Sequence, residues 1–167
     1  TERMRVESGG DGVIKTNNPA YKLDVNGTVN ATALYVGGSP LSSGFDPDVD
    51  TIAIGTTAGQ TSQGSYAVAV GYQAGNSNQT SYAVAVGYDT GKTSQGSYAV
   101  ALGYQAGNSN QGSYAVALGW RAGQSSQSFF TVAMGYQAGQ TNQGAYSVAM
   151  GQNAGKLGQG AYSTAVG

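Results

Sequence analysis

The segment Tyr66-Ala67-Val68-Ala69-Val70-Gly71-Tyr72 decides the fold, because close variants of it recur every sixteen residues. Each copy of its Val-Ala-Val-Gly core ends on a glycine. These glycines are Gly55, Gly71, Gly87, Gly103, Gly119, Gly135, Gly151 and Gly167. So strict a period is typical of a chain that stacks one structural unit along an axis. The sequence therefore predicts a rod built of repeated coils.

Three further columns of the repeat are nearly constant, which means that each position meets the same surroundings in every unit. The glutamine column is Gln63, Gln79, Gln95, Gln111, Gln127, Gln143 and Gln159. The first aromatic column is Tyr66, Tyr82, Tyr98, Tyr114, Phe130, Tyr146 and Tyr162. The second is Tyr72, Tyr88, Tyr104, Trp120 and Tyr136. We expect these columns to form ladders, because identical side chains stacked in register share hydrogen bonds and ring contacts.

Alternate side chains of each core segment point to opposite faces of a strand. The valines and the flanking tyrosines form a bulky face, and the alanines form a small face that lets backbone layers approach closely. A helix is excluded, because each unit carries two or three glycines that each cost about 1 kcal/mol in a helix interior. Two short strands and two turns account for sixteen residues. We therefore predict an all-β fold, a parallel β-roll or β-solenoid with 16-residue coils.

A coil this small encloses little, so its bulky face would stay open to water along the whole rod. That stripe would far exceed the few hundred Å² of contiguous apolar surface usual for a soluble monomer. Other copies of the chain are the simplest cover, and a threefold bundle buries three identical stripes around one axis. We therefore predict a homotrimer. Its seam is expected to contain Val68, Val84, Val100, Val116, Val132 and Val148.

Charge and turn residues divide the chain into three regions. Residues 1–36 hold alternating apolar and polar residues and the hairpin signal Asn26-Gly27, which predict a region of short strands and hairpins. Residues 37–50 are rich in Gly, Pro and Asp and are expected to be a linker. Residues 51–167 form the repeat array.

The array resembles a known family. The runs Ala67-Val68-Ala69-Val70-Gly71, Ala99-Val100-Ala101-Leu102-Gly103 and Ser147-Val148-Ala149-Met150-Gly151 are similar to the repeat of YadA-like trimeric autotransporter adhesin heads. The resemblance covers roughly residues 51–167. It implies a left-handed parallel β-roll, a trimer, and a location outside a bacterial cell.

The leading region, residues 1–45, resembles segments of phage and large-virus tail or surface fibres. The resemblance is carried by Glu2-Arg3-Met4-Arg5-Val6 and Tyr21-Lys22-Leu23-Asp24-Val25-Asn26-Gly27-Thr28. Taken together, the two resemblances favour an extracellular virion fibre, with a bacterial cell surface as the alternative location.

Three classes of function compete. The first is a structural fibre segment that extends an attachment or adhesion element. The second is an adhesin head whose repeat face itself binds a host-surface glycan or protein. The third is a single-chain solenoid such as an ice-binding protein, which the scattered threonines disfavour.

Two groups of residues are candidate binding sites. Trp120, Arg121 and Phe129 depart from the uniform columns and are the first place to look for a ligand, although a drifted repeat explains them too. Asp46, Asp48 and Asp50 alternate in the linker. They lack the Gly and Glu of a calcium loop, so a solvated acidic linker is the simpler interpretation and a cation on a threefold axis the alternative.

Composition argues against catalysis and several kinds of partner. The chain has no His and no Cys, and only 9% of its 167 residues are charged, with a net charge of −1. We expect no enzyme activity and no cofactor, because the usual bases and nucleophiles are missing or unpaired. The sequence has no cluster of Lys and Arg, so nucleic-acid binding is not predicted. No apolar run approaches the roughly 20 residues that would span a membrane.

Overall fold

The computed structural model describes residues 35–36, 39–40 and 51–167. Two short strands, β1 (Tyr35–Val36) and β2 (Ser39–Pro40), pair antiparallel, so residues 39–40 of the predicted linker take part in a ladder. The predicted hairpin at Asn26-Gly27 and the linker carboxylates Asp46, Asp48 and Asp50 lie outside the described residues. Expectations about them stay predictions.

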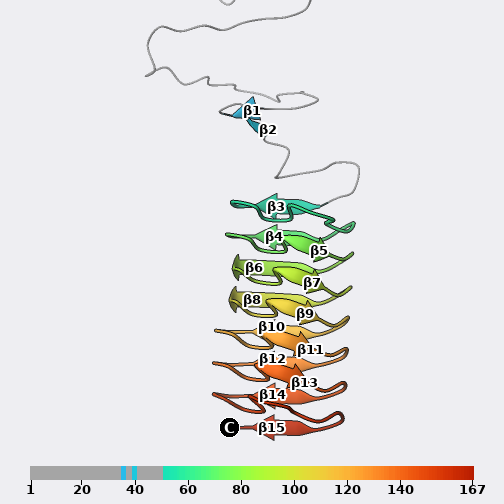
Figure 1. The fold of residues 1–167 in the computed structure, drawn as a ribbon, viewed down its shortest axis with the longest axis vertical. Coiled ribbons are helices and arrows are strands. Elements are labelled where there is room, and N and C mark those ends of the chain that lie inside the picture. Colours follow the sequence, from blue (N-terminus) through green and yellow to red (C-terminus); the bar gives the residue numbers. More distant parts are fainter. Residues whose placement is uncertain (1–34, 37–38, 41–50) are drawn as a thin grey trace, which may run out of the picture. The chain divides into compact units, whose positions relative to one another are not determined.

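From residue 52 onward the chain winds into stacked coils whose strands form two parallel sheets (Figure 1). The eight-stranded sheet, called here the apolar sheet, contains β3 (Ile52–Ile54), β4 (Val68–Val70), β6 (Val84–Tyr88), β8 (Val100–Tyr104), β10 (Val116–Leu118), β12 (Val132–Met134), β14 (Val148–Met150) and β15 (Thr164–Val166). The five-stranded polar sheet contains β5 (Ser77–Gln79), β7 (Thr93–Gln95), β9 (Ser109–Gln111), β11 (Ser125–Gln127) and β13 (Thr141–Gln143).

The register of both sheets follows the period of the sequence. In the apolar sheet Val116 pairs with Val132, and in the polar sheet Gln111 pairs with Gln127. Strands of the two sheets run in opposite directions within a coil (Figure 1). The predicted all-β solenoid of 16-residue coils is therefore confirmed, and the described residues include no α-helix. The structure holds one chain, so the trimer stays a proposal.

The space between the sheets is filled by small residues and glutamines. In the described part of the chain every fully buried hydrophobic residue is an alanine, as at Ala101, Ala106 and Ala115. The largest fully buried side chains are glutamines such as Gln79 and Gln95. The interior thus has no room for Val, Leu or Met, and these larger side chains must lie outside it.

Left-handed backbone recurs at fixed columns of each coil, both in the turns and at the centre of each strand of the polar sheet. In one coil, φ is +53° at Gln105, +54° at Asn110 and +59° at Tyr114. The repeat-closing glycine Gly103 has φ +131°, a region that side chains with a Cβ rarely enter. A Cβ on Gly103 would also lie 2.5 Å from the carbonyl oxygen of Gly119 in the next coil. Glycine recurs at this column because both the dihedral angle and the coil spacing require it.

Replacing Gly103 with Ala is expected to lower the free energy of unfolding by about 2–3 kcal/mol, through backbone strain and the contact with the Gly119 carbonyl. Two control variants separate these causes. Gly158 has φ +64° with open space around it, and Gly160 has open space alone. In denaturant titrations, Gly158→Ala should cost less than Gly103→Ala, and Gly160→Ala least. Equal losses in all three would contradict this account of the glycine column.

Candidate functional site

The outer face of the apolar sheet carries large apolar side chains that the interior of the solenoid does not hold. The six predicted seam valines occupy the first strand position from β4 to β14, half-buried between their neighbours, whereas β3 begins with Ile52 and β15 with Thr164. Two residues later lies a more exposed column, in which Leu102 is 38% and Met150 44% exposed. We call the two columns together the apolar stripe. It continues along the whole array and, in the single chain, faces solvent.

Two aromatic ladders lie at the two ends of the strands of the apolar sheet, and Tyr88 and Tyr104 of the second ladder are the last residues of β6 and β8. In the first, ring centroids of successive coils lie 4.7–5.3 Å apart, as between Tyr82 and Tyr98 at 4.8 Å. In the second, Trp120 lies 6.0 Å from Tyr104 and 4.7 Å from Tyr136. All these pairs are near-parallel, so each inner ring has its faces covered by its neighbours. The ladders therefore offer mainly ring edges to a ligand.

Ring stacking is expected to stabilise the coil stack, because an aromatic pair contributes about 0.5–1.5 kcal/mol beyond its buried area. Tyr98 stacks on two rings, whereas Tyr162 stacks on one and is 81% exposed. Tyr98→Ala should lower the free energy of unfolding by about 1–3 kcal/mol. Tyr162→Ala, at a matching φ of +55°, should cost less than half as much. Thermal denaturation checks this, and equal effects would contradict a stabilising ladder.

The structure places the irregular residues Trp120 and Arg121 together in the second ladder and places Phe129 beside the first. Trp120 belongs to the second ladder, and the Arg121 guanidinium carbon lies 4.3 Å from its ring centroid. Arg121 Nε also donates to Gln105 Oε1 at 3.0 Å. Phe129 instead packs edge-on against two members of the first ladder, Phe130 and Tyr146. The Trp120 face that could stack on a sugar is already in contact with protein groups.

The glutamine column lies inside the coils. The Nε2 group of Gln111 donates to the carbonyl oxygens of Val100 at 3.0 Å and Ala115 at 3.3 Å. Other glutamines repeat this pattern, and Gln79 donates in addition to Gln95 Oε1 in the next coil at 3.1 Å. Each glutamine therefore joins the two sheets of a coil through its donor group. From Gln79 to Gln143 these side chains are buried and out of reach of a ligand.

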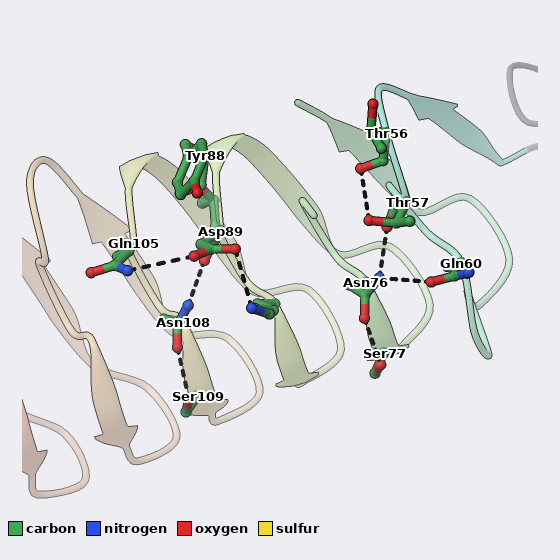
Figure 2. Close-up of polar contacts among 12 residues, drawn as sticks. Thr56, Thr57, Gln60, Asn76, Ser77, Tyr88, Asp89, Gln105, Asn108 and Ser109 are labelled. Carbon is green, nitrogen blue, oxygen red and sulfur yellow. Dashed lines mark hydrogen bonds and ion pairs between the residues drawn. The ribbon is translucent and has the colours of Figure 1, made fainter. Parts of the chain in front are cut away.

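A polar edge runs along the turn that leads into the polar sheet (Figure 2). Asn108 Nδ2 donates to the Asp89 carbonyl at 2.7 Å, and Asn76 Nδ2 donates to the Thr57 carbonyl at 2.8 Å, so asparagines bridge successive coils. The Asp89 carboxylate pairs with Lys92 at 3.3 Å. Desolvation, followed by the nearby Asp89 charge, raises the pKa of Tyr88. This edge is a hydrogen-bonded network in which the buried Asp89 Oδ1 accepts no hydrogen bond and has the Lys92 ammonium as its ion-pair partner.

One residue at this edge was not expected from the sequence. Thr90 occupies the column that is otherwise alanine in every coil, and it is fully buried. Its Oγ1 donates to the Gly103 carbonyl at 2.6 Å, which satisfies the hydroxyl inside the coil. The sequence shows Thr90 as the one residue other than alanine in its column. That difference alone does not indicate whether the threonine side chain points into the coil or out of it.

The described residues contain no group of three or more His, Cys, Asp or Glu side chains that could hold a metal ion. Nor does that part of the chain contain a helix long and apolar enough to cross a membrane. The candidate surface is thus an extended apolar face bordered by ring edges. Such a surface is suited to an extended interface with another protein and less suited to a localised active site.

The fold and this surface define a repeat protein of the parallel β-solenoid class. The family model of the YadA head domain repeat matches residues 94–122 in two copies. The resemblance to YadA-like adhesin heads is confirmed by this match. No curated protein and no solved structure matches the chain.

Proposed function

We propose that residues 51–167 form a segment of a homotrimeric surface fibre, a rod that extends an attachment or adhesion element away from a virion or cell. One observation carries this proposal: the interior holds only small residues and glutamines, so the larger apolar side chains form a continuous exposed stripe. An exposed apolar surface that runs the length of the chain marks a site of contact with another molecule. The match to a YadA head repeat supports the same conclusion, because those adhesins are trimeric.

The mechanism of such a fibre is mechanical. Parallel ladders join each coil to the next, with backbone hydrogen bonds of 2.7–3.3 Å such as Val100 N to the Ala115 carbonyl at 2.9 Å. Three stripes packed around one axis would add a dry seam with the six seam valines at its centre. The result is a stiff rod that leaves few open backbone segments for proteases. No reaction is assigned to this chain.

Molar mass in solution tests the trimer. Light scattering on the purified chain should give about three times the single-chain mass of 16.8 kDa, unchanged on dilution into the nanomolar range. A stable particle of 16.8 kDa would overturn the proposal. The location is tested separately by the flanking sequence: a fibre chaperone would support the virion that we favour, and a membrane anchor would support a bacterial surface.

The second candidate function is an adhesin whose repeat face binds a host glycan or protein. The observation that favours it is the exposed pair Phe129 and Phe130, which are 45% and 47% exposed. A glycan array and a panel of matrix proteins test it. Phe129→Ser and Trp120→Tyr restore the residues that other coils carry at these columns. A ligand whose binding survives both reversions does not use the irregular residues.

A further inference from the structure

A trimer built of near-identical coils has a problem of alignment. Coils repeat at a spacing of about 4.8 Å. One copy could therefore slide along its partners by a single coil and lose only one layer of contact. Repetitive strands of this kind specify their register weakly unless side chains differ from layer to layer. Something in the seam must distinguish one coil from the next.

Most columns cannot supply this distinction. The alanine and glutamine columns are buried inside each chain and would never meet a partner. The first column of the apolar stripe is valine in every coil from Val68 to Val148. Both aromatic columns are nearly uniform tyrosine.

The second column of the apolar stripe does vary, and it does so in order. We call it the graded column. Its residues are Ile54, Val70, Val86, Leu102, Leu118, Met134, Met150 and Val166. It is half-buried to exposed in the single chain, so it would contact partners in an assembly. From Val70 to Met150 side-chain length rises in steps from Val through Leu to Met, and Ile54 and Val166 at the two ends stand outside this series.

We propose that the graded column sets the register of the trimer, an inference that rests on the proposed homotrimeric fibre. With the copies level, each layer contains three identical side chains. A slip of one coil creates mixed layers, such as Val86 beside Leu102 and Leu118 beside Met134. A slip of two coils mixes every layer. Mixed layers are either overpacked or leave gaps, and both lower stability. The partner that this surface fits is thus a level copy of the same chain.

Introduced thiols can test the register, because the chain contains no cysteine. Val100→Cys and Val116→Cys lie one coil apart in the valine column, outside the graded column. The two full-length variants, distinguished by mass tags, are unfolded together in equal amounts, refolded and oxidised with copper phenanthroline. Level copies join thiols at the same position. Disulfides between position 100 and position 116 report a slip.

With the natural graded column, we expect disulfides between the two positions to be at least tenfold rarer than those at one position. A second background, called levelled because it makes the graded column valine from position 70 to position 166, carries Leu102→Val, Leu118→Val, Met134→Val and Met150→Val. In that background the mixed disulfides, those between position 100 and position 116, should become at least fivefold more frequent while the molar mass stays that of a trimer. A reversed background, with Val70→Met, Val86→Met, Met134→Val and Met150→Val, keeps the composition and an ordered column. Copies that carry the reversed background should align in register, so their mixed disulfides should stay as rare as in the natural chain.

The outcomes separate the two proposals. A levelled trimer whose mixed disulfides stay as rare as in the natural chain would overturn the register inference and leave the trimer standing. Natural chains that slip freely would overturn it as well. A single-chain mass for the natural protein would instead overturn the proposed fibre itself. If the levelled background fails to fold, the reversed background decides: frequent mixed disulfides in it contradict the inference, and level copies support it.

Discussion

Val100→Asp is expected to abolish assembly and leave single chains or aggregates. Val100 opens β8 on the outer face of the apolar sheet, half-buried by its neighbours in a lone chain. In the proposed trimer, three carboxylates would meet near the axis without partners. Burying unpaired like charges is strongly unfavourable, so the assembled state loses more than the single coil does. Light scattering should show the mass falling toward 16.8 kDa.

The matched control for this variant places the same charge on the other sheet. Asn110 lies in β9 of the polar sheet, is exposed, and has φ +54°, a conformation that Asp tolerates nearly as well as Asn. Asn110→Asp should therefore keep the trimer mass and the thermal midpoint of the natural chain. If Val100→Asp also gave an intact, heat-resistant trimer, the seam would have to lie on another face.

Sequence parity located the apolar stripe correctly but described its borders too simply. Val68 and Val70 share the outer face because β4 is an extended strand of three residues. Tyr66 lies outside that strand at φ +62°, and Gly71 follows it at φ +125°. Alternation of faces holds only within extended backbone. The positions of the rings therefore depend on corner geometry that a period-two pattern does not contain.

The glutamine column shows a second limit of reasoning from the sequence. The repeat predicts stacked glutamines, yet glutamine is usually found at the surface, so composition alone does not place Gln111 inside. A clue lies four residues earlier: a Cβ on Gly107 would approach Gln111 Oε1 to 2.6 Å. The missing side chain makes room for the amide. Recognising this needs the closed coil, in which columns that are distant in sequence face each other.

Gln111→Glu is expected to be the most destabilising single change inside a coil. The Gln111 side chain is buried, and its Nε2 group donates to the carbonyl oxygens of Val100 and Ala115. A carboxylate would turn both contacts from attraction to repulsion and bury a charge with no cation near it. At neutral pH we expect the free energy of unfolding to fall by about 3–5 kcal/mol. Gln152→Glu, on an exposed turn with no side-chain hydrogen bond, is the control and should change stability little.

The loss in Gln111→Glu should shrink as the pH falls, and the sign follows from linkage. Burial raises the pKa of the introduced carboxyl in the folded chain above its unfolded value of about 4.3. The folded state then binds the proton more tightly, so its stability relative to the natural chain increases as the pH drops through the raised pKa. The protonated acid can also donate to the Val100 carbonyl again. Denaturant titrations of both chains from pH 8 to pH 4 measure the difference, and a gap that stays constant with pH would mean that the side chain at position 111 has escaped to water.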